Sequence, residues 1–462
     1  MNSNDRLASK KSVIFYGAGD FASQLVWTYI GAYLTVFYTD IVGLTPSIIA
    51  AIMLGARIWD AFNDPVMGNI AENTRTKFGR FRPYIAFGSP LLAVFSVLTF
   101  TNPFADNSTI QIIWATVTYA VTGMLYTLVN IPYAALSGVM TTNTYQRNQI
   151  NSSRNIGMNL GMIFVNALSI PIAIFFSGEG ATATTQDGYA MTALLYSTLS
   201  VPLFLLVFFT AKEKIQPKNE HKNNSVKVTF NNLVSNKYLM IVTAIMLIQM
   251  TAFMGRISVS IYYVIYCLGS YSLIAVFFTI PSIGAVIGSI FVPFLAEKYG
   301  KRNVLMCSML VQALGLIIIY LSPFNNLTYV FIGCVIFGLF NVGFPMTLSM
   351  VADSVDYMES KTGIRTDGTA YATYGLATKM GSAIGGSVGI LIIGSFGYVA
   401  NQNQTMEAIN GINLVVNLIP ALLFVLASAF CLMWDIDDVD VKGFKKDTRN
   451  NKIDTLINST KL

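Results

Sequence analysis

The chain has 462 residues, of which 54% are hydrophobic and only 11% are Asp, Glu, Lys or Arg. A soluble domain carries about 25% of these charged residues, so the composition excludes a water-soluble enzyme and indicates a polytopic membrane protein. The net charge of +6 does not indicate nucleic-acid binding, because the basic residues lie in short segments between apolar stretches. The single histidine, His221, lies in a polar segment, which excludes a histidine-rich metal site.

A transmembrane helix needs about 20 predominantly apolar residues. Twelve stretches meet this requirement, which predicts an all-α membrane protein with twelve transmembrane helices. The predicted spans are residues 15–39, 46–71, 83–103, 110–139, 151–176, 189–211, 238–268, 271–296, 303–322, 328–352, 369–398 and 411–434.

Lys and Arg are distributed unequally over the connections between these spans. The connections near residues 40, 106 and 269, and those at 177–188, 323–327 and 399–410, contain neither residue, whereas the connections between them are basic. Basic loops stay on the cytoplasmic side of a membrane. The pattern therefore predicts that both termini are cytoplasmic.

The longest polar interior segment, residues 212–237, separates two groups of six spans. A turn with an acidic residue, a glycine and then basic residues follows the second span at Glu72–Arg80, and a similar turn follows the eighth span at Glu297–Arg302. Many secondary transporters are built from such internal repeats. We therefore predict two pseudo-symmetric six-helix bundles, residues 1–211 and 238–434, with a cytoplasmic middle loop at 212–237 and a cytoplasmic tail at 435–462.

The second span carries two acids, Asp60 and Asp64, together with Arg57. Their spacing of three and four residues places them on one helix face. Each carboxylate near the middle of a membrane costs at least about 2.5–3.5 kcal/mol on insertion scales, so something must offset this cost. We interpret the face as a cation site; the alternative is a structural network in which Arg57 pairs with one of the acids.

Twelve spans, the middle loop and the doubled turn resemble the major facilitator superfamily. Several motifs resemble, more narrowly, its glycoside–pentoside–hexuronide:cation symporters. These motifs are Tyr16–Phe21, Phe37–Asp40 with Gly43, Ala56–Gly68, Lys77–Pro83, Tyr126–Tyr133, Ala352–Tyr357 and Thr362–Gly368.

The resemblance implies the major facilitator fold and a secondary active transporter in a bacterial plasma membrane. Such a protein imports a small glycoside (a pentoside, hexuronide or galactoside) by symport with Na⁺ or H⁺ through alternating access. It implies no enzymatic activity and no cofactor besides the coupling ion, and one chain, as a monomer, contains both halves. A cation-independent facilitator or an exporter of another small solute is the alternative.

The resemblance also implies a cation site made by Asp60, Asn63, Asp64 and Thr127, with Asp60 and Asp64 as the charged ligands for Na⁺. Carboxylate, amide and hydroxyl oxygens are hard donors that suit a small cation. Without a cation, two carboxylates four residues apart repel one another, and one of them takes up a proton. The same residues therefore also allow H⁺ coupling.

For the sugar, the resemblance makes Asp20 the main acceptor of substrate hydroxyls. Gly19, Asn130, Ala134 and Phe344 replace the Lys, Asp, Trp and Trp of galactoside-transporting members, which favours a glucuronide, a xyloside or another small glycoside. The expected substrate-binding residues are Asp20, Tyr126, Asn130, Tyr133, Arg154, Phe344 and Lys379, with Trp27 and Tyr29 nearby.

Ion pairs that form and break at one membrane face are an expected gating device. We assign this role to Arg57, Asp353, Asp356 and Arg365, and expect Arg154 to join the last three. Lys379 either links the cation and sugar sites or pairs only with Asp60 or Asp64.

Overall fold

The computed structural model describes residues 8–141, 144–178, 181, 184–214, 236–362 and 367–436. Within these ranges the regular structure is helical, apart from an isolated bridge between Thr76 and Gly79. Ten of the described helices are long and apolar enough to cross a membrane. The prediction of an all-α membrane protein is confirmed.

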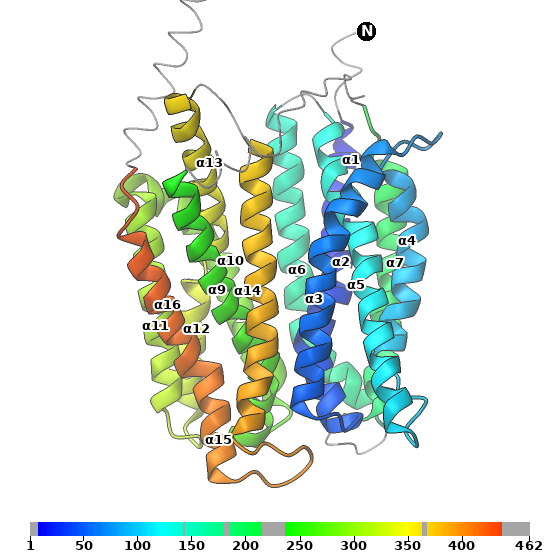
Figure 1. The fold of residues 1–462 in the computed structure, drawn as a ribbon, viewed down its shortest axis with the longest axis vertical. Coiled ribbons are helices and arrows are strands. Elements are labelled where there is room, and N and C mark those ends of the chain that lie inside the picture. Colours follow the sequence, from blue (N-terminus) through cyan, green and yellow to red (C-terminus); the bar gives the residue numbers. More distant parts are fainter. Residues whose placement is uncertain are drawn as a thin grey trace, which may run out of the picture. The chain divides into compact units, whose positions relative to one another are not determined.

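The helices follow the predicted spans closely (Figure 1). A short helix, α1 (Lys10–Phe15), precedes the first span. The first six spans are α2 (Gly17–Val36) with the π-helical turn η2 (Phe37–Ile41), α3 (Pro46–Asn73), α4 (Arg82–Thr99), α5 (Ser108–Val139), α6 (Thr144–Phe176) and α7 (Gln186–Thr210). The second six are α9 (Lys237–Tyr262) with η3 (Tyr263–Cys267), α10 (Leu273–Tyr299), α11 (Lys301–Leu321), α12 (Leu327–Leu339) with α13 (Gly343–Thr362), α14 (Asp367–Ser395), and α15 (Met406–Asn413) with η4 (Leu414–Leu418) and α16 (Ile419–Cys431).

One predicted span is wrong as a continuous helix. The tenth, residues 328–352, is interrupted at residues 340–342, between α12 and α13. At the break the backbone carbonyl of Phe340 accepts hydrogen bonds from the amide of Val342 over 2.8 Å and from Gln312 Nε2 of α11 over 2.9 Å. A side chain from a neighbouring helix therefore helps to satisfy the backbone where the helical pattern is lost.

The chain divides into two compact units. Unit 1 comprises Met1–Glu220, Gly255–Ser282 and Gly386–Val416, and unit 2 comprises His221–Met254, Ile283–Gly385 and Asn417–Leu462. These boundaries differ from those of the two six-helix bundles expected from the sequence, which stay a prediction. In unit 2, α11 packs against α12 and α16.

In unit 1, α2 packs against α6 and α7, α4 packs against α5 and α7, and α3 packs against α5 (Figure 1). The approach of α2 to α6 depends on glycine. A methyl group on Gly157 would lie 1.9 Å from the carbonyl oxygen of Gly17, and one on Gly161 would lie 3.0 Å from the carbonyl oxygen of Phe21. Small residues allow such close backbone contact between membrane helices.

Helix α5 begins at Asn107, whose side chain accepts hydrogen bonds from the backbone amides of Thr109 and Ile110. It runs for 32 residues and contains Pro132. Proline has no N–H, so the helix lacks the hydrogen bond that residue 132 would donate to the carbonyl of Leu128. Residues 123–133 of α5 contact the acids of α2 and α3.

Candidate functional site

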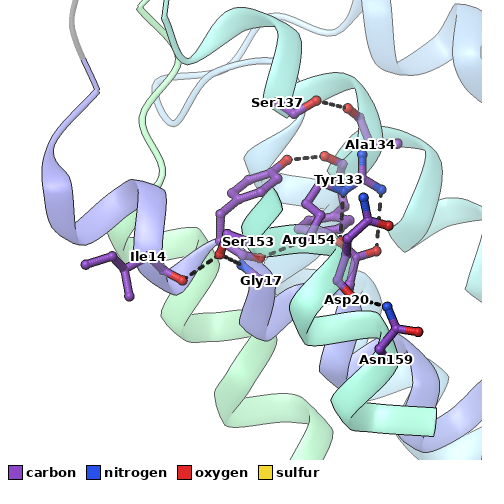
Figure 2. Close-up of polar contacts among 11 residues, drawn as sticks. Ile14, Gly17, Asp20, Tyr133, Ala134, Ser137, Ser153, Arg154 and Asn159 are labelled. Atoms are coloured by element: carbon purple, nitrogen blue, oxygen red, sulfur yellow. Dashed lines mark hydrogen bonds and ion pairs between the residues drawn. The ribbon is translucent and has the colours of Figure 1, made fainter. Parts of the chain in front are cut away.

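Asp20 of α2 is the centre of a polar cluster in unit 1. Its carboxylate is buried, with 8% of the residue exposed. Arg154 of α6 donates from Nε to Asp20 Oδ2 over 2.8 Å and from an Nη atom to Oδ1 over 3.4 Å. The hydroxyl of Tyr133 on α5 lies 2.8 Å from the same Oδ2 (Figure 2). We call Asp20, Tyr133 and Arg154 the Asp20 centre.

Tyr133 is fixed by a reciprocal contact with Tyr16. The two rings stack with centroids 4.7 Å apart and an interplanar angle of 17°. The Tyr16 hydroxyl donates to the backbone oxygen of Tyr133, and the Tyr133 hydroxyl lies 2.7 Å from the backbone oxygen of Tyr16. Tyr16 was not among the predicted site residues, although it lies one helical turn before Asp20.

Gly19 makes room for the Tyr133 ring. A methyl group on Gly19 would lie 2.4 Å from Tyr133 Cε2. The neighbouring Gly17 donates from its backbone amide to Ser153 Oγ over 3.1 Å, and Ser153 Oγ donates in turn to the carbonyl of Ile14 over 2.8 Å (Figure 2). In this chain, a side chain at position 19 would collide with the Tyr133 ring. This explains why glycine stands where galactoside-transporting members have lysine.

The Asp20 centre suits a neutral, hydroxyl-rich molecule. A carboxylate accepts about four hydrogen bonds, and three donor atoms already point at Asp20. Arg154 uses two of its five N–H groups here, and its positive charge balances that of Asp20. The pair retains both acceptor and donor capacity with no net charge.

The two acids of α3 face α5. Asp64 Oδ1 accepts a hydrogen bond from Thr127 Oγ1 over 2.9 Å. Asp60 is 9% exposed, and a methyl group on Gly123, one turn before Thr127, would lie 3.2 Å from Asp60 Oδ1. Both carboxylates therefore lie at a helix–helix interface, as a cation site requires.

The donor set between α3 and α5 fits a small, hard cation. Asn63 adds an amide beside the acids, and its Nδ2 is buried with no hydrogen-bond partner among the described residues. No group of three or more His, Cys, Asp and Glu side chains gathers within the described ranges. A site here consequently draws half of its side chains from an amide and a hydroxyl.

Arg57 joins these acids to the aromatic side chains of α2 and α5. Its guanidinium lies 3.5 Å from Asp60 Oδ2, and its Cζ lies 4.6 Å from the centroid of the Trp27 ring. Trp27 stacks in turn on Tyr126, with centroids 4.3 Å apart and an interplanar angle of 20°. Arg57, Trp27 and Tyr126 thus form a continuous stack, which we call the Trp27 stack.

Helix α5 carries residues of both clusters. Gly123 and Thr127 meet the acids of α3, whereas Tyr126 and Tyr133 meet α2. Asn130 lies between Tyr126 and Tyr133 at helical spacing and is half-buried. One predicted cation residue, Thr127, therefore lies beside predicted sugar residues along α5, and the other cation residues lie on α3.

Four of the predicted residues that the structure describes lie in unit 2. Asp353 is 7% exposed and pairs with Lys301 Nζ over 2.5 Å. Asp356 is half-buried on the same helix, and Lys379 is exposed on α14. Phe344 is 42% exposed, with its ring 6.2 Å from that of Tyr374.

The predicted gate is only partly described. Arg365 lies outside the described residues. Arg154 pairs with Asp20, and its expected contact with Asp353 and Asp356 stays a prediction. Within unit 2, Asp353 pairs with Lys301, which belongs to the basic turn that follows the eighth span.

A third polar cluster has no predicted role. Asp40 in η2 is 8% exposed and accepts hydrogen bonds from Tyr266 and Tyr398. The sequence singles out its motif, Phe37–Asp40, only through the family resemblance. The partners lie more than 220 residues away, so no local signal in the sequence could have identified them.

Comparison with known proteins gives a consistent result. The family model described as MFS/sugar transport protein matches residues 15–438. The isoprimeverose transporter of Lactiplantibacillus pentosus is 32% identical over 92% of this chain and 89% of that protein. The putative glycoside/cation symporter YagG of Escherichia coli is 29% identical over 94% of each chain.

The fold is that of solved transporters. The crystal structure of a D-xylose-proton symporter superposes with a TM-score of 0.66 at 15% identity, over 92% of this chain and 97% of that one. The predicted major facilitator fold is therefore confirmed, and the protein is a membrane transporter rather than an enzyme. By its family match and its relatives, the chain belongs to the MFS/sugar transport protein family, within the branch of glycoside:cation symporters.

Proposed function

We propose that this protein imports a small neutral glycoside by symport with Na⁺ or H⁺ through alternating access. Asp60, Asn63, Asp64 and Thr127 hold the cation, and the Asp20 centre with Tyr126 and Asn130 holds the sugar. Both termini face the cytoplasm of a bacterial cell. The observation that carries the proposal is that Asp60 and Asp64 point toward α5, the helix that also supplies Tyr133 to Asp20.

The physical argument for a coupling ion is one of charge. Arg57 contacts Asp60 and Thr127 donates a hydrogen bond to Asp64, so two carboxylates lie together at this interface. A bound cation or proton would stabilise them there, because a buried charge is favourable when it is paired. Coupling to H⁺ or to Na⁺ is compatible with the same oxygen atoms.

The Asp20–Arg154 ion pair favours a neutral sugar over a hexuronide. A substrate carboxylate at this position would have to compete with Asp20 for the guanidinium and would lie close to a like charge. Neutral hydroxyl groups use the remaining acceptor sites on Asp20 and the remaining N–H groups of Arg154. The names of the relatives, an isoprimeverose transporter and a putative glycoside/cation symporter, support a glycoside substrate.

Uptake into membrane vesicles tests the proposal. Labelled xylosides and glucuronides are supplied with an imposed Na⁺ gradient, an imposed pH gradient or neither. We expect the wild type to accumulate a neutral glycoside only with one of the gradients. Asp64→Asn should lose accumulation but keep exchange of labelled for unlabelled sugar.

The matched control is Asp106→Asn, which changes an exposed acid outside the helices and should behave as the wild type. If Asp60→Asn and Asp64→Asn both accumulate sugar as the wild type does, the acids do not carry the coupling ion. Equal uptake with and without every gradient would instead indicate a facilitator. Preferred uptake of glucuronides would contradict the neutral-substrate assignment alone.

A further inference from the structure

The cluster around Asp40 lies at the end of α2 opposite Asp20. Asp40 belongs to η2, one of the π-helical turns of the described chain. Tyr266 belongs to another, η3, so two π-helical turns meet at one carboxylate. Such turns are rare and occur often at functional sites.

Three hydroxyl groups point at the Asp40 carboxylate. Tyr266 donates to Oδ2 over 2.7 Å, and Tyr398 donates to Oδ1 over 2.5 Å. Thr39 Oγ1 lies 2.6 Å from Oδ1 and 2.7 Å from the hydroxyl of Tyr262. With Tyr262 donating to Thr39 and Thr39 donating to Asp40, each hydroxyl proton has an acceptor.

The backbone around Asp40 is held as well. Asn401 donates from Nδ2 to the carbonyl oxygen of Asp40. Asn401 has φ of 58°, and it is the single non-glycine residue with positive φ among those described. Asparagine tolerates this left-handed conformation better than most residues. The left-handed backbone at Asn401 therefore lies where the connection between α14 and α15 (Figure 1) contacts η2.

Aromatic rings cover the same contacts. The ring centroid of Tyr398 lies 5.0 Å from that of Tyr262 and 5.6 Å from that of Tyr266. The hydrogen bond from Tyr398 to Asp40 is buried, where it is stronger than in solvent. All of these residues belong to unit 1.

Asp40 thus ties together three segments that are far apart in the sequence. One is the end of the first span, one is the end of the seventh, and one is the connection after the eleventh. In a carrier of two repeats, such a junction must separate whenever the path opens at that end. A carboxylate is suited to this, because it is well hydrated once the hydroxyls move away.

We propose that Asp40 is the acceptor of an extracellular latch, formed with Tyr266, Tyr398 and Asn401, that holds the outer end of the transport path closed. The proposal rests on the proposed function for its orientation and for the cycle in which the latch opens. Loss of the tyrosine hydroxyls should shift the population toward the outward-open state. Sugar outside the cell binds only the outward-open state. When a larger fraction of the protein is in this state, the apparent dissociation constant for external sugar falls in the same proportion.

Hydrogen exchange read by mass spectrometry, on full-length protein in lipid nanodiscs, tests the latch without requiring transport. We compare Tyr266→Phe and Tyr398→Phe with the wild type. Amides of residues 37–44 and 396–405 should exchange at least threefold faster in both variants, and residues 301–339 of unit 2 should be unchanged. The Asp40→Asn variant should show the same pattern.

Tyr38→Phe is the matched control. Tyr38 lies in the same π-helical turn, and its buried hydroxyl donates to the carbonyl of Ala115 over 3.1 Å, so the variant loses one buried hydrogen bond outside the latch. If Tyr266→Phe and Tyr398→Phe exchange no faster than Tyr38→Phe at residues 37–44, the latch does not exist. This outcome is independent of whether Asp40→Asn folds.

A second measurement separates the latch from the proposed function. In right-side-out vesicles, the two latch variants should half-saturate with external glycoside at a concentration at least threefold lower than the wild type. The variants could instead show faster exchange at residues 37–44 together with a higher half-saturating concentration of external glycoside. That result would place the latch at the cytoplasmic end and overturn the extracellular assignment. If the wild type moves no glycoside, the proposed function fails, while the exchange experiment still decides the latch.

Discussion

The hydroxyl of Thr127 donates a hydrogen bond to Asp64 Oδ1 over 2.9 Å, joining α5 to α3. This bond aligns an acid of the second span with the helix that carries Tyr133. It also occupies an oxygen that a coupling cation would use, so the hydroxyl must turn its lone pair to the ion when the ion binds.

Thr127→Val should weaken cation binding more than Thr127→Ser. Valine has the same shape without the oxygen, whereas serine keeps the oxygen. The bound cation loses an oxygen ligand in the valine variant only, so we expect the cation concentration for half-maximal uptake to rise for valine and to change less for serine. Uptake measured as a function of Na⁺ concentration and of pH checks this, and equal values for the two variants would contradict a direct ligand role.

Trp27→Leu should weaken the link between cation and sugar binding. The cation–π contact between Arg57 and Trp27 contributes about 0.5–2 kcal/mol, and its loss leaves Arg57 held by Asp60 alone. We expect the tightening of sugar binding by the cation to fall about two- to tenfold, with a smaller loss for Trp27→Phe. Calorimetric titration of sugar with and without cation measures this coupling, which must be reciprocal.

Arg154→Gln should destabilise the protein more than the double variant Asp20→Asn with Arg154→Gln. Removing one member of a buried ion pair leaves the other charge unpaired, at a cost of about 3–5 kcal/mol. The double variant leaves no such charge. Thermal unfolding in detergent measures the difference, and both variants should lose sugar binding. Equal unfolding temperatures would show that Asp20 is hydrated rather than dependent on Arg154.

Gly19→Ala should impair both folding and uptake, whereas Gly31→Ala on the same helix should not. The added methyl at position 19 would meet the Tyr133 ring at 2.4 Å, but nothing lies within 4 Å of a methyl at position 31. Overpacking typically costs about 1–3 kcal/mol, whereas alanine at an open helical position gains about 0.5–1 kcal/mol. The unfolding temperatures should therefore move in opposite directions.

The sequence is informative about the helices because apolar length decides where a chain crosses a membrane. Most predicted boundaries lie within a few residues of the observed ones. The interruption at 340–342 was missed because its surroundings are apolar, and the compensating donor, Gln312, comes from another helix. Only the packed structure shows such a contact.

The acidic residues of the candidate site could be predicted from the sequence, because a charge inside a membrane span is costly. Asp20, Asp60 and Asp64 are conspicuous because they interrupt apolar spans, and the structure buries or pairs them in unit 1. Their partners were not predictable in the same way. Arg154 lies 134 residues from Asp20, and nothing in its neighbours distinguishes a contact with Asp20 from one with Asp353.

Pro132 gives α5 one turn with a missing backbone bond, and this turn falls between Thr127 and Tyr133. Thr127, which contacts Asp64, lies before this turn, and Tyr133, which contacts Asp20, lies after it. A bend at this turn would move Thr127 relative to Tyr133 without breaking a further backbone hydrogen bond, because proline has already removed one. Replacing Pro132 with alanine would restore the hydrogen bond to the carbonyl of Leu128 and make α5 stiffer between Thr127 and Tyr133.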